Sequence, residues 1–212
     1  MAGIIDRVTE YLTAKNEVRD LTLSRSRSLI RFCANSIRAA HRHEYDEARA
    51  LLAEAQEAAR TVQADASAYP DIYHAGYLQD ALKELAEASI VLAIVTGQPI
   101  PDPDELGIEY AAYLNGLAEA MGEMRRYALD SMRRDDIAAA EALLEVMDDV
   151  YSHLVTIDFP DALTGGLRRT TDMVRGVTER TRGDLTTAYR EERLQEALQA
   201  LEAKLDCQTD ST

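Results

Sequence analysis

Two glutamates, Glu84 and Glu87, stand at the edge of an uncharged run in the segment LKELAEASIVLAIVTG, residues 82–97. On a helix with about 100° per residue, both share a face with Val91 and Val95. A face that stays in water would not become apolar within two turns, so we expect both carboxylates at the margin of a packed region, where they could bind metal. The alternative is that they are half-exposed glutamates of an amphipathic helix.

A second pair, Glu119 and Glu123, lies four residues apart in the segment LAEAMGEMRR. Because glycine inside a helix costs about 1 kcal/mol relative to alanine, the glycines beside this pair indicate close approach by a helix, a metal or a phosphate backbone. The alternative is helix packing alone. The same helix face carries small and polar residues, namely Ala112, Asn115, Gly116, Gly122 and Arg126.

If the two acidic faces meet, four carboxylates converge on one site, the oxygen-rich setting that Mg²⁺ or Mn²⁺ requires. Two such ions could activate a water molecule and stabilise the leaving oxygen of a phosphodiester. A histidine metal site is not predicted, because the histidines are scattered along the chain at positions 41, 43, 74 and 153.

Arginines supply a complementary signal, because residues 21–43 contain no acidic residue in a chain that is otherwise rich in them. Arginines at helical spacing offer the guanidinium forks that bind phosphates. The alternative is that they pair with acidic helices of the bundle or across a subunit contact. Four of them fall within about 60° on one helical wheel, namely Arg27, Arg31, Arg38 and Arg42.

The net charge of −15 argues against a nucleic-acid partner at ordinary salt. Lysine is rare, at Lys15, Lys83 and Lys204 only, and the other basic residues are arginines. This acidic, arginine-rich composition is what we expect of a salt-loving cytoplasm, where the Debye length falls to about 3 Å at 1 M salt. Local clusters of charge would then decide binding.

Helix-favouring residues dominate the 212-residue chain, and 46% apolar composition is enough for a core. Proline and glycine divide it into predicted helices over residues 4–43, 45–67, 71–96, 104–132, 135–157 and 167–204, with a break near Gly107. We expect an all-α bundle over residues 1–204 as a single domain, and a frayed polar tail over 205–212. No secretory signal or membrane span is predicted, which favours the cytoplasm, and Cys33 and Cys207 suit reduced thiols.

Three blocks of the sequence resemble the translin family, which comprises translin and translin-associated factor X. They are SRSRSLIRFCANSIRAAHR, LQDALKELAEASIVLAIVTG and YLNGLAEAMGEMRRYALDSM, and the final segment FPDALTGGLRRTTDMVRGVTERTRGDL is similar to the family's last helix. The resemblance covers residues 17–190. It implies a fold of about seven helices, an octameric shell and binding of single-stranded RNA or DNA.

The partner-type subunit of that family is a metal-dependent ribonuclease with an ExxE and a DxxxE carboxylate pair. Glu84 and Glu87 match the first pair, and Glu119 and Glu123 match the second with glutamate in place of aspartate. The basic segment that translin places before the third-helix block reads YPDIYHAGY here and is not basic, which shifts the expected phosphate contacts to the arginines of residues 27–42.

The leading hypothesis is a homo-oligomeric protein, with or without a second family subunit, that binds single-stranded nucleic acid and cleaves RNA through Mg²⁺ or Mn²⁺. Its catalytic and metal-binding residues would be Glu84, Glu87, Glu119 and Glu123. One alternative is a binding shell of the same fold without catalysis. Another is a helical scaffold whose arginines make subunit contacts.

Overall fold

The computed structural model describes residues 1–209, with side chains described to residue 204. This part of the chain is helical and contains no β-strand, which confirms the predicted all-α class. Its helices are α1 (Ala2–His41), α2 (Tyr45–Ala66), α3 (Pro70–Tyr73), α4 (Gly76–Val95), α5 (Pro103–Leu106), α6 (Tyr110–Met132), α7 (Ile137–Leu154), α8 (Asp161–Thr164) and α9 (Leu167–Thr209).

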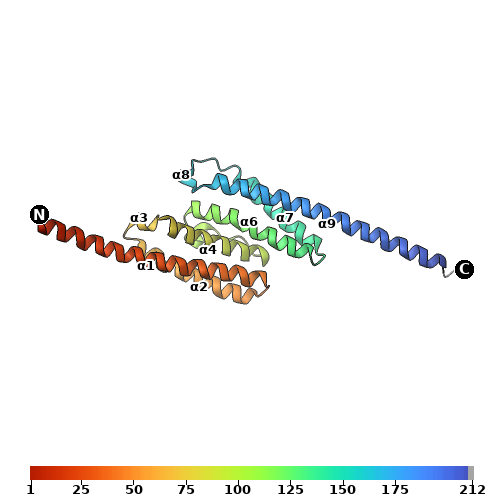
Figure 1. Ribbon diagram of the computed structural model, residues 1–212, viewed down its shortest axis with the longest axis horizontal. Coiled ribbons are helices and arrows are strands. Elements are labelled where there is room, and N and C mark those ends of the chain that lie inside the picture. Colours follow the sequence, from red (N-terminus) through yellow and green to blue (C-terminus); the bar gives the residue numbers. More distant parts are fainter. Residues whose placement is uncertain (210–212) are drawn as a thin grey trace.

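The long helices pack in order across an elongated bundle (Figure 1). α1 contacts α2 and α4, α4 contacts α6, and α6 contacts both α7 and α9. The pair formed by α4 and α6 therefore lies in the middle of the bundle. The two chain ends project at opposite ends of the molecule, because the first half of α1 and the last half of α9 extend beyond the other helices.

The boundaries of the helices follow local chemistry. The predicted helix over 71–96 is divided by His74 and Ala75 into α3 and α4, a break that the sequence analysis did not predict. The predicted break near Gly107 is present, where Gly107 ends α5 with the left-handed φ of 64° that glycine adopts without strain. α9 continues to Thr209, into the predicted tail, and residues 210–212 lie outside the described residues.

The hydrophobic core is centred on α4, in which the run from Ala88 to Ala93 is buried without interruption. Met121 and Met124 of α6 are fully buried against it, and α1 contributes Leu29. Burial of one such side chain stabilises the fold by roughly 1.5–3 kcal/mol. The core therefore fixes α4 and α6 relative to each other.

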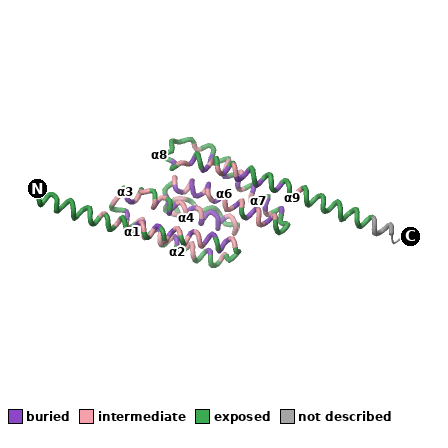
Figure 2. The backbone as a smooth tube through the Cα atoms, in the orientation of Figure 1, coloured by how far each residue is buried: buried purple, intermediate pink, exposed green. Residues whose placement is uncertain are grey.

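The projecting halves of α1 and α9, the latter as far as residue 204, are mostly exposed to solvent (Figure 2). The first buried residue of α1 is Thr22, and Leu185 is the last buried residue of α9 within its described side chains. Both exposed halves still carry apolar side chains at helical spacing. These are Ile4, Ile5, Val8, Tyr11 and Leu12 on α1, and Leu194, Leu198 and Leu201 on α9.

Among the described residues, none of the helices combines the length and the apolar character that crossing a membrane requires.

Candidate metal centre

α4 places Glu84 and Glu87 one turn apart at the edge of its buried side. Both glutamates are half-buried, whereas Leu85 and Ala86 between them are buried in the core. Both glutamates therefore lie at the margin of a packed region. The sequence predicted this position, because the helix face that carries Glu84 and Glu87 continues into Val91 and Val95. The position matters because a half-buried carboxylate has lost part of its hydration and still faces a solvent-accessible site.

Gly116 lets α6 come close to α4 at this point. A Cβ atom added to Gly116 would lie 2.6 Å from the carbonyl oxygen of Lys83 and 3.0 Å from the amide nitrogen of Glu87. Gly122, by contrast, has open space around the position of a Cβ atom. The close approach indicated by Gly116 is therefore helix packing, and it brings the acidic faces of α4 and α6 together.

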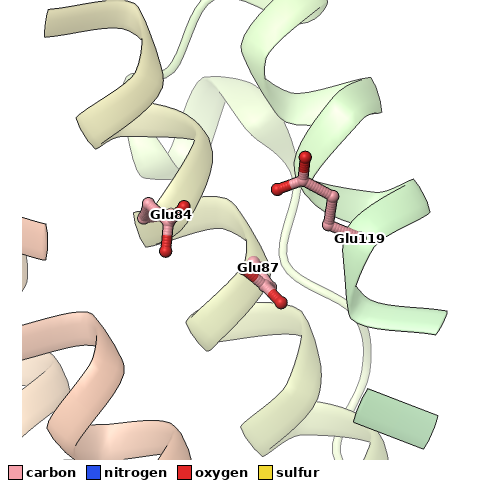
Figure 3. A group of neighbouring side chains, drawn as sticks. All are labelled: Glu84, Glu87 and Glu119. Atoms are coloured by element: carbon pink, nitrogen blue, oxygen red, sulfur yellow. The ribbon is translucent and has the colours of Figure 1, made fainter. Parts of the chain in front are cut away.

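Three of the four predicted carboxylates meet at this contact. One carboxylate oxygen from each of Glu84, Glu87 and Glu119 lies within 4.8 Å of the other two. Figure 3 shows the first two side chains on α4 and the third on the neighbouring helix α6. We call these three residues the acidic cluster. Their oxygen atoms are close enough together for a single metal ion to contact all three.

The acidic cluster holds more negative charge than its surroundings compensate. Burial, reinforced by the charges of Glu84, Glu119 and Glu123, raises the pKa of Glu87 to about 8. Burial also raises the pKa of Glu84, although the nearby ammonium of Lys83 opposes this shift. Bringing these carboxylates together therefore costs free energy that a bound cation would recover.

Lys83 is the only basic side chain that forms an ion pair with the acidic cluster among the described residues. Its Nζ atom lies 2.7 Å from one carboxylate oxygen of Glu119 and 3.9 Å from an oxygen of Glu84. Burial opposes the ammonium charge, but Glu119 and the other nearby carboxylates outweigh it and raise the pKa of Lys83. The cluster thus contains one internal counter-ion for three carboxylates.

Glu123, the fourth predicted carboxylate, lies outside this group of three. Its carboxylate contacts the imidazole Nε2 of His41, the last residue of α1. This hydrogen bond lowers the pKa of Glu123 and outweighs the opposing effect of burial. The charge of Glu123 still contributes to the raised pKa of Glu87, so the residue belongs to the same electrostatic environment as the acidic cluster.

Sequence reasoning missed both Lys83 and His41. Lys83 directly precedes Glu84, but its neighbours gave no sign that it would reach across to α6. His41 lies 82 residues before Glu123, and no short-range pattern connects the two. The sequence does contain one usable signal. Tyr127 lies four residues after Glu123 and therefore on the same face of α6. In the structure, the Tyr127 ring on this face stacks on the His41 imidazole.

The predicted arginine stripe is partly free and partly paired. Arg27, Arg31 and Arg38 are exposed, and Arg38 donates a hydrogen bond to the side-chain oxygen of Asn35. Arg42 instead pairs with Glu44 and with a carboxylate of α2, as the alternative of ion pairing anticipated. The first three arginines are therefore exposed and form no ion pair among the described residues, whereas the fourth is partly neutralised.

Comparison with known proteins gives a consistent assignment. No protein-family model matches the chain. The uncharacterized protein MJ0175 of Methanocaldococcus jannaschii is 32% identical over 203 residues, which cover 95% of this chain and 90% of that protein. AfC3PO, also solved with duplex RNA, is 34% identical, with a TM-score of 0.83 over 88% of this chain and 97% of its own.

A further solved structure, apo-NeC3PO, has a TM-score of 0.80 over 87% of this chain and 96% of its own. At 22% identity it supports the fold alone. C3PO is the complex of translin with translin-associated factor X. The shared fold and the 34% identity with AfC3PO over nearly the whole of both chains mean that this chain belongs to the translin family.

Proposed function

We propose that this protein is an oligomeric RNA-binding endoribonuclease that uses Mg²⁺ or Mn²⁺ held by the acidic cluster. The observation that carries the proposal is the convergence of Glu84, Glu87 and Glu119 from two helices, with their oxygens within 4.8 Å of one another. A surface made only for solubility would keep such charges apart, because like charges repel most strongly where water is excluded.

The donors of the acidic cluster fit a hard divalent cation. Carboxylate oxygens are the ligands that Mg²⁺ and Mn²⁺ prefer, and the described side chains of the cluster include neither histidine nor cysteine. The raised pKa of Glu87 fits as well, because it reflects negative charge that a cation would neutralise. When bound, such an ion would lower the pKa of a water molecule and make it a better nucleophile toward a phosphodiester.

The protein's own residues would have three roles in this reaction. Glu84, Glu87 and Glu119 would hold the ion, which requires Glu87 to lose the proton that its pKa of about 8 favours at neutral pH. Glu123 keeps an ionised carboxylate beside the cluster because His41 hydrogen-bonds to it. Lys83 would be displaced in part from Glu119 when a cation competes for the same oxygens.

Two features support nucleic-acid binding by an oligomer. Arg27, Arg31 and Arg38 present exposed guanidinium groups along one face of α1, and the related AfC3PO has been solved with duplex RNA. The exposed apolar faces at both chain ends are surfaces that a second subunit could cover. We extend the proposal to single-stranded RNA or DNA as the preferred ligand and to an octameric shell, on the resemblance to the translin family.

The test is cleavage of labelled single-stranded and duplex RNA by the purified protein, with Mn²⁺ or with EDTA, at low and at molar salt. We expect cleavage that requires Mn²⁺ and that is lost in Glu87→Gln and Glu119→Gln. Glu57→Gln is the matched control, because Glu57 is an exposed glutamate of α2 that pairs with Arg60. Cleavage that survives EDTA or both substitutions would contradict the proposal.

A binding shell without catalysis is the second candidate, and the Lys83 ion pairs favour it. An ammonium already contacts Glu119 and lies near Glu84, so part of the charge is neutralised without a metal. On this reading the protein would bind RNA equally well with Mn²⁺ and with EDTA and would cleave it under neither condition. The cleavage assay separates the two candidates directly.

A further inference from the structure

His41 and Tyr127 form a buried polar contact that the proposed reaction does not by itself require. The His41 side chain is 5% exposed, and its ring stacks on that of Tyr127 with the centroids 4.3 Å apart and the planes inclined by 21°. His41 ends α1, whereas Tyr127 belongs to α6. The contact therefore joins the outer helix α1 to the helix that carries Glu119 and Glu123.

This contact is costly if its only role is packing. The Nδ1 atom of His41 and the hydroxyl of Tyr127 are buried, and neither finds a hydrogen-bond partner among the described residues. Each such unsatisfied polar group costs about 1–3 kcal/mol. A phenylalanine at either position would fill the same space without that cost, so the imidazole at position 41 needs another explanation.

The explanation lies at the other imidazole nitrogen. Nε2 of His41 contacts Oε2 of Glu123, and the guanidinium of Arg126 lies 4.0 Å from the same oxygen. The carboxylate is therefore held by one oxygen, while the other, Oε1, forms no hydrogen bond among the described residues. Glu123 lies one helical turn after Glu119 on the same face of α6, next to the acidic cluster.

We propose that His41 is a positioning residue that holds Glu123 as the outer, fourth carboxylate of the metal centre. The inference rests on the proposed function, because it assigns a role to His41 only if the acidic cluster binds a cation. Residues that hydrogen-bond to a metal-binding carboxylate orient it and limit its motion, and losing one typically weakens metal binding about 10–100-fold.

The geometry also accounts for the rest of the contact. Stacking on Tyr127 favours one plane of the imidazole, in which Nε2 contacts Glu123. Burial keeps water from competing for the same hydrogen bond. Leaving His41 Nδ1 and the Tyr127 hydroxyl without partners costs free energy. In return, the contact holds the Glu123 carboxylate in one position.

The experiment compares three variants by titrating the full-length protein with Mn²⁺ in a calorimeter. His41→Phe keeps a flat ring against Tyr127 but loses the hydrogen-bond donor. His41→Gln loses the stacked ring but keeps a side-chain N–H donor. His153→Phe is the matched control, because His153 pairs with the carboxylate of Asp149 on the exposed side of α7.

We expect His41→Phe to bind Mn²⁺ about tenfold more weakly than the wild type, or weaker still. His41→Gln should lose much less Mn²⁺ affinity than His41→Phe, and His153→Phe should have the Mn²⁺ affinity of the wild type. A purely structural role for His41 predicts the opposite order, with His41→Phe, which preserves packing, closer to the wild type. That order, or equal affinities in all variants, would overturn the inference.

A double-mutant cycle with Glu123→Gln isolates the pair. If His41 acts through Glu123, His41→Phe should weaken Mn²⁺ binding in the wild type but have no further effect in Glu123→Gln. Additive losses would overturn the inference. If the wild-type protein binds no Mn²⁺ at all, both the proposed metal centre and the inference are wrong. If the wild type binds Mn²⁺ and the substitutions of His41 do not change its affinity, only the inference is wrong.

A second measurement keeps the inference testable if His41→Phe does not fold. The ring signals of His41 in a nuclear magnetic resonance spectrum of wild-type protein should shift when Mg²⁺ is added, because the carboxylate that holds the ring would engage the ion. The same shift should be absent in folded Glu87→Gln that no longer binds Mg²⁺. Unchanged His41 signals on saturation of the wild type with Mg²⁺ would contradict the inference.

Discussion

The ammonium nitrogen of Lys83 lies 2.8 Å from one carboxylate oxygen of Glu119 and 2.7 Å from the other. The two side chains come from adjacent helices, α4 and α6, and meet beside the acidic cluster. Lys83 therefore contacts both oxygens through which Glu119 would bind a metal ion. The protein carries a cation of its own at the edge of its proposed metal centre.

Replacing Lys83 by methionine should tighten Mn²⁺ binding and destabilise the metal-free protein. The neutral side chain has a similar length but no longer competes for Glu119, while three carboxylates lose their counter-ion. Hydrogen bonds to charged groups contribute about 1.5–3 kcal/mol, and we expect a loss near the lower end because Lys83 is partly exposed. Calorimetric titration and urea unfolding with EDTA measure the two effects.

Lys15→Met is the matched control for this substitution. Lys15 pairs with Asp71 at 2.6 Å and does not contact the acidic cluster, so its loss should leave Mn²⁺ affinity unchanged. If Lys83→Met binds Mn²⁺ more weakly than the wild type, Lys83 is not a competitor of the metal.

Stability should depend on pH through Glu87. The pKa of Glu87 is about 8 in the folded protein and about 4.5 in the unfolded chain. Between these pH values the Glu87 carboxyl is protonated in the native state and ionised in the unfolded state. The contribution to stability is therefore complete below pH 4.5 and is lost as pH rises through about 8. Relative to Glu87→Gln, the wild type should lose up to about 1.4 kcal/mol per pH unit in this window.

Urea unfolding of both proteins at several pH values between 4.5 and 9, with EDTA present, checks this dependence. The difference between the two proteins removes the contributions of other groups to first order. Mn²⁺ binding below pH 8 should in addition release a proton, which calorimetry in buffers of different ionisation enthalpy detects. Parallel stability curves for the two proteins would show that Glu87 ionises normally.

Helical periodicity was sufficient to predict part of this site. Glu84 and Glu87 are one turn apart on a helix face that continues into Val91 and Val95. This pattern predicted that both carboxylates lie at the margin of the core. The same reasoning on α6 predicted that Glu119 faces the site and that Gly116 marks a close approach. Proline and glycine residues predicted most of the helix ends. These features are local, because each depends on residues within two turns of one helix.

The remaining features depend on contacts between distant residues. The division of the acidic residues into a cluster of three and a separate pair of Glu123 with His41 follows from the contact that His41, at the end of α1, makes with α6. The Lys83 ion pair depends on how closely α4 and α6 approach. Helical periodicity does not specify such distances, so all four carboxylates were expected in one site and His41 was not assigned to it.

The close contact of α4 with α6 can be tested at Gly116, with Gly122 of the same helix as the control. In Gly116→Ala, the new Cβ atom would overlap the carbonyl oxygen of Lys83 at 2.6 Å, and we expect a loss of about 1–3 kcal/mol in the free energy of unfolding. Gly122→Ala meets no atom within 4 Å and should stabilise the helix by about 0.5–1 kcal/mol.

Because Gly116→Ala pushes apart the backbones that carry Glu87 and Glu119, it should also weaken Mn²⁺ binding, whereas Gly122→Ala should leave it unchanged. Thermal unfolding and calorimetric titration measure both effects. Equal stability of the two variants would mean that α6 does not depend on glycine for its approach to α4.

The exposed arginines of α1 should govern RNA affinity and its dependence on salt. Replacing Arg31 by alanine removes one phosphate contact and should reduce the slope of log affinity against log salt by about 0.7 for a single strand. Arg60→Ala is the matched control, because Arg60 is an exposed arginine of α2 paired with Glu57. Fluorescence anisotropy with labelled RNA, from low to molar salt, gives the slopes.

The oligomeric state of Arg31→Ala, measured by sedimentation velocity, separates two roles of the stripe. An intact oligomer with weaker RNA binding supports phosphate contacts. Dissociation of the oligomer would instead support the scaffold hypothesis, in which these arginines join subunits.

The apolar faces of the projecting helices should hold the subunits together. Leu198 of α9 and Val8 of α1 are 51% and 48% exposed, and burying each such side chain stabilises a contact by roughly 1.5–3 kcal/mol. Leu198→Glu and Val8→Glu should therefore lower the mass measured by light scattering while the circular dichroism spectrum stays helical. Gln199→Glu adds the same charge to α9 away from its leucine stripe and should leave the mass unchanged. If all three variants keep the mass of the wild type, the subunits associate through another surface.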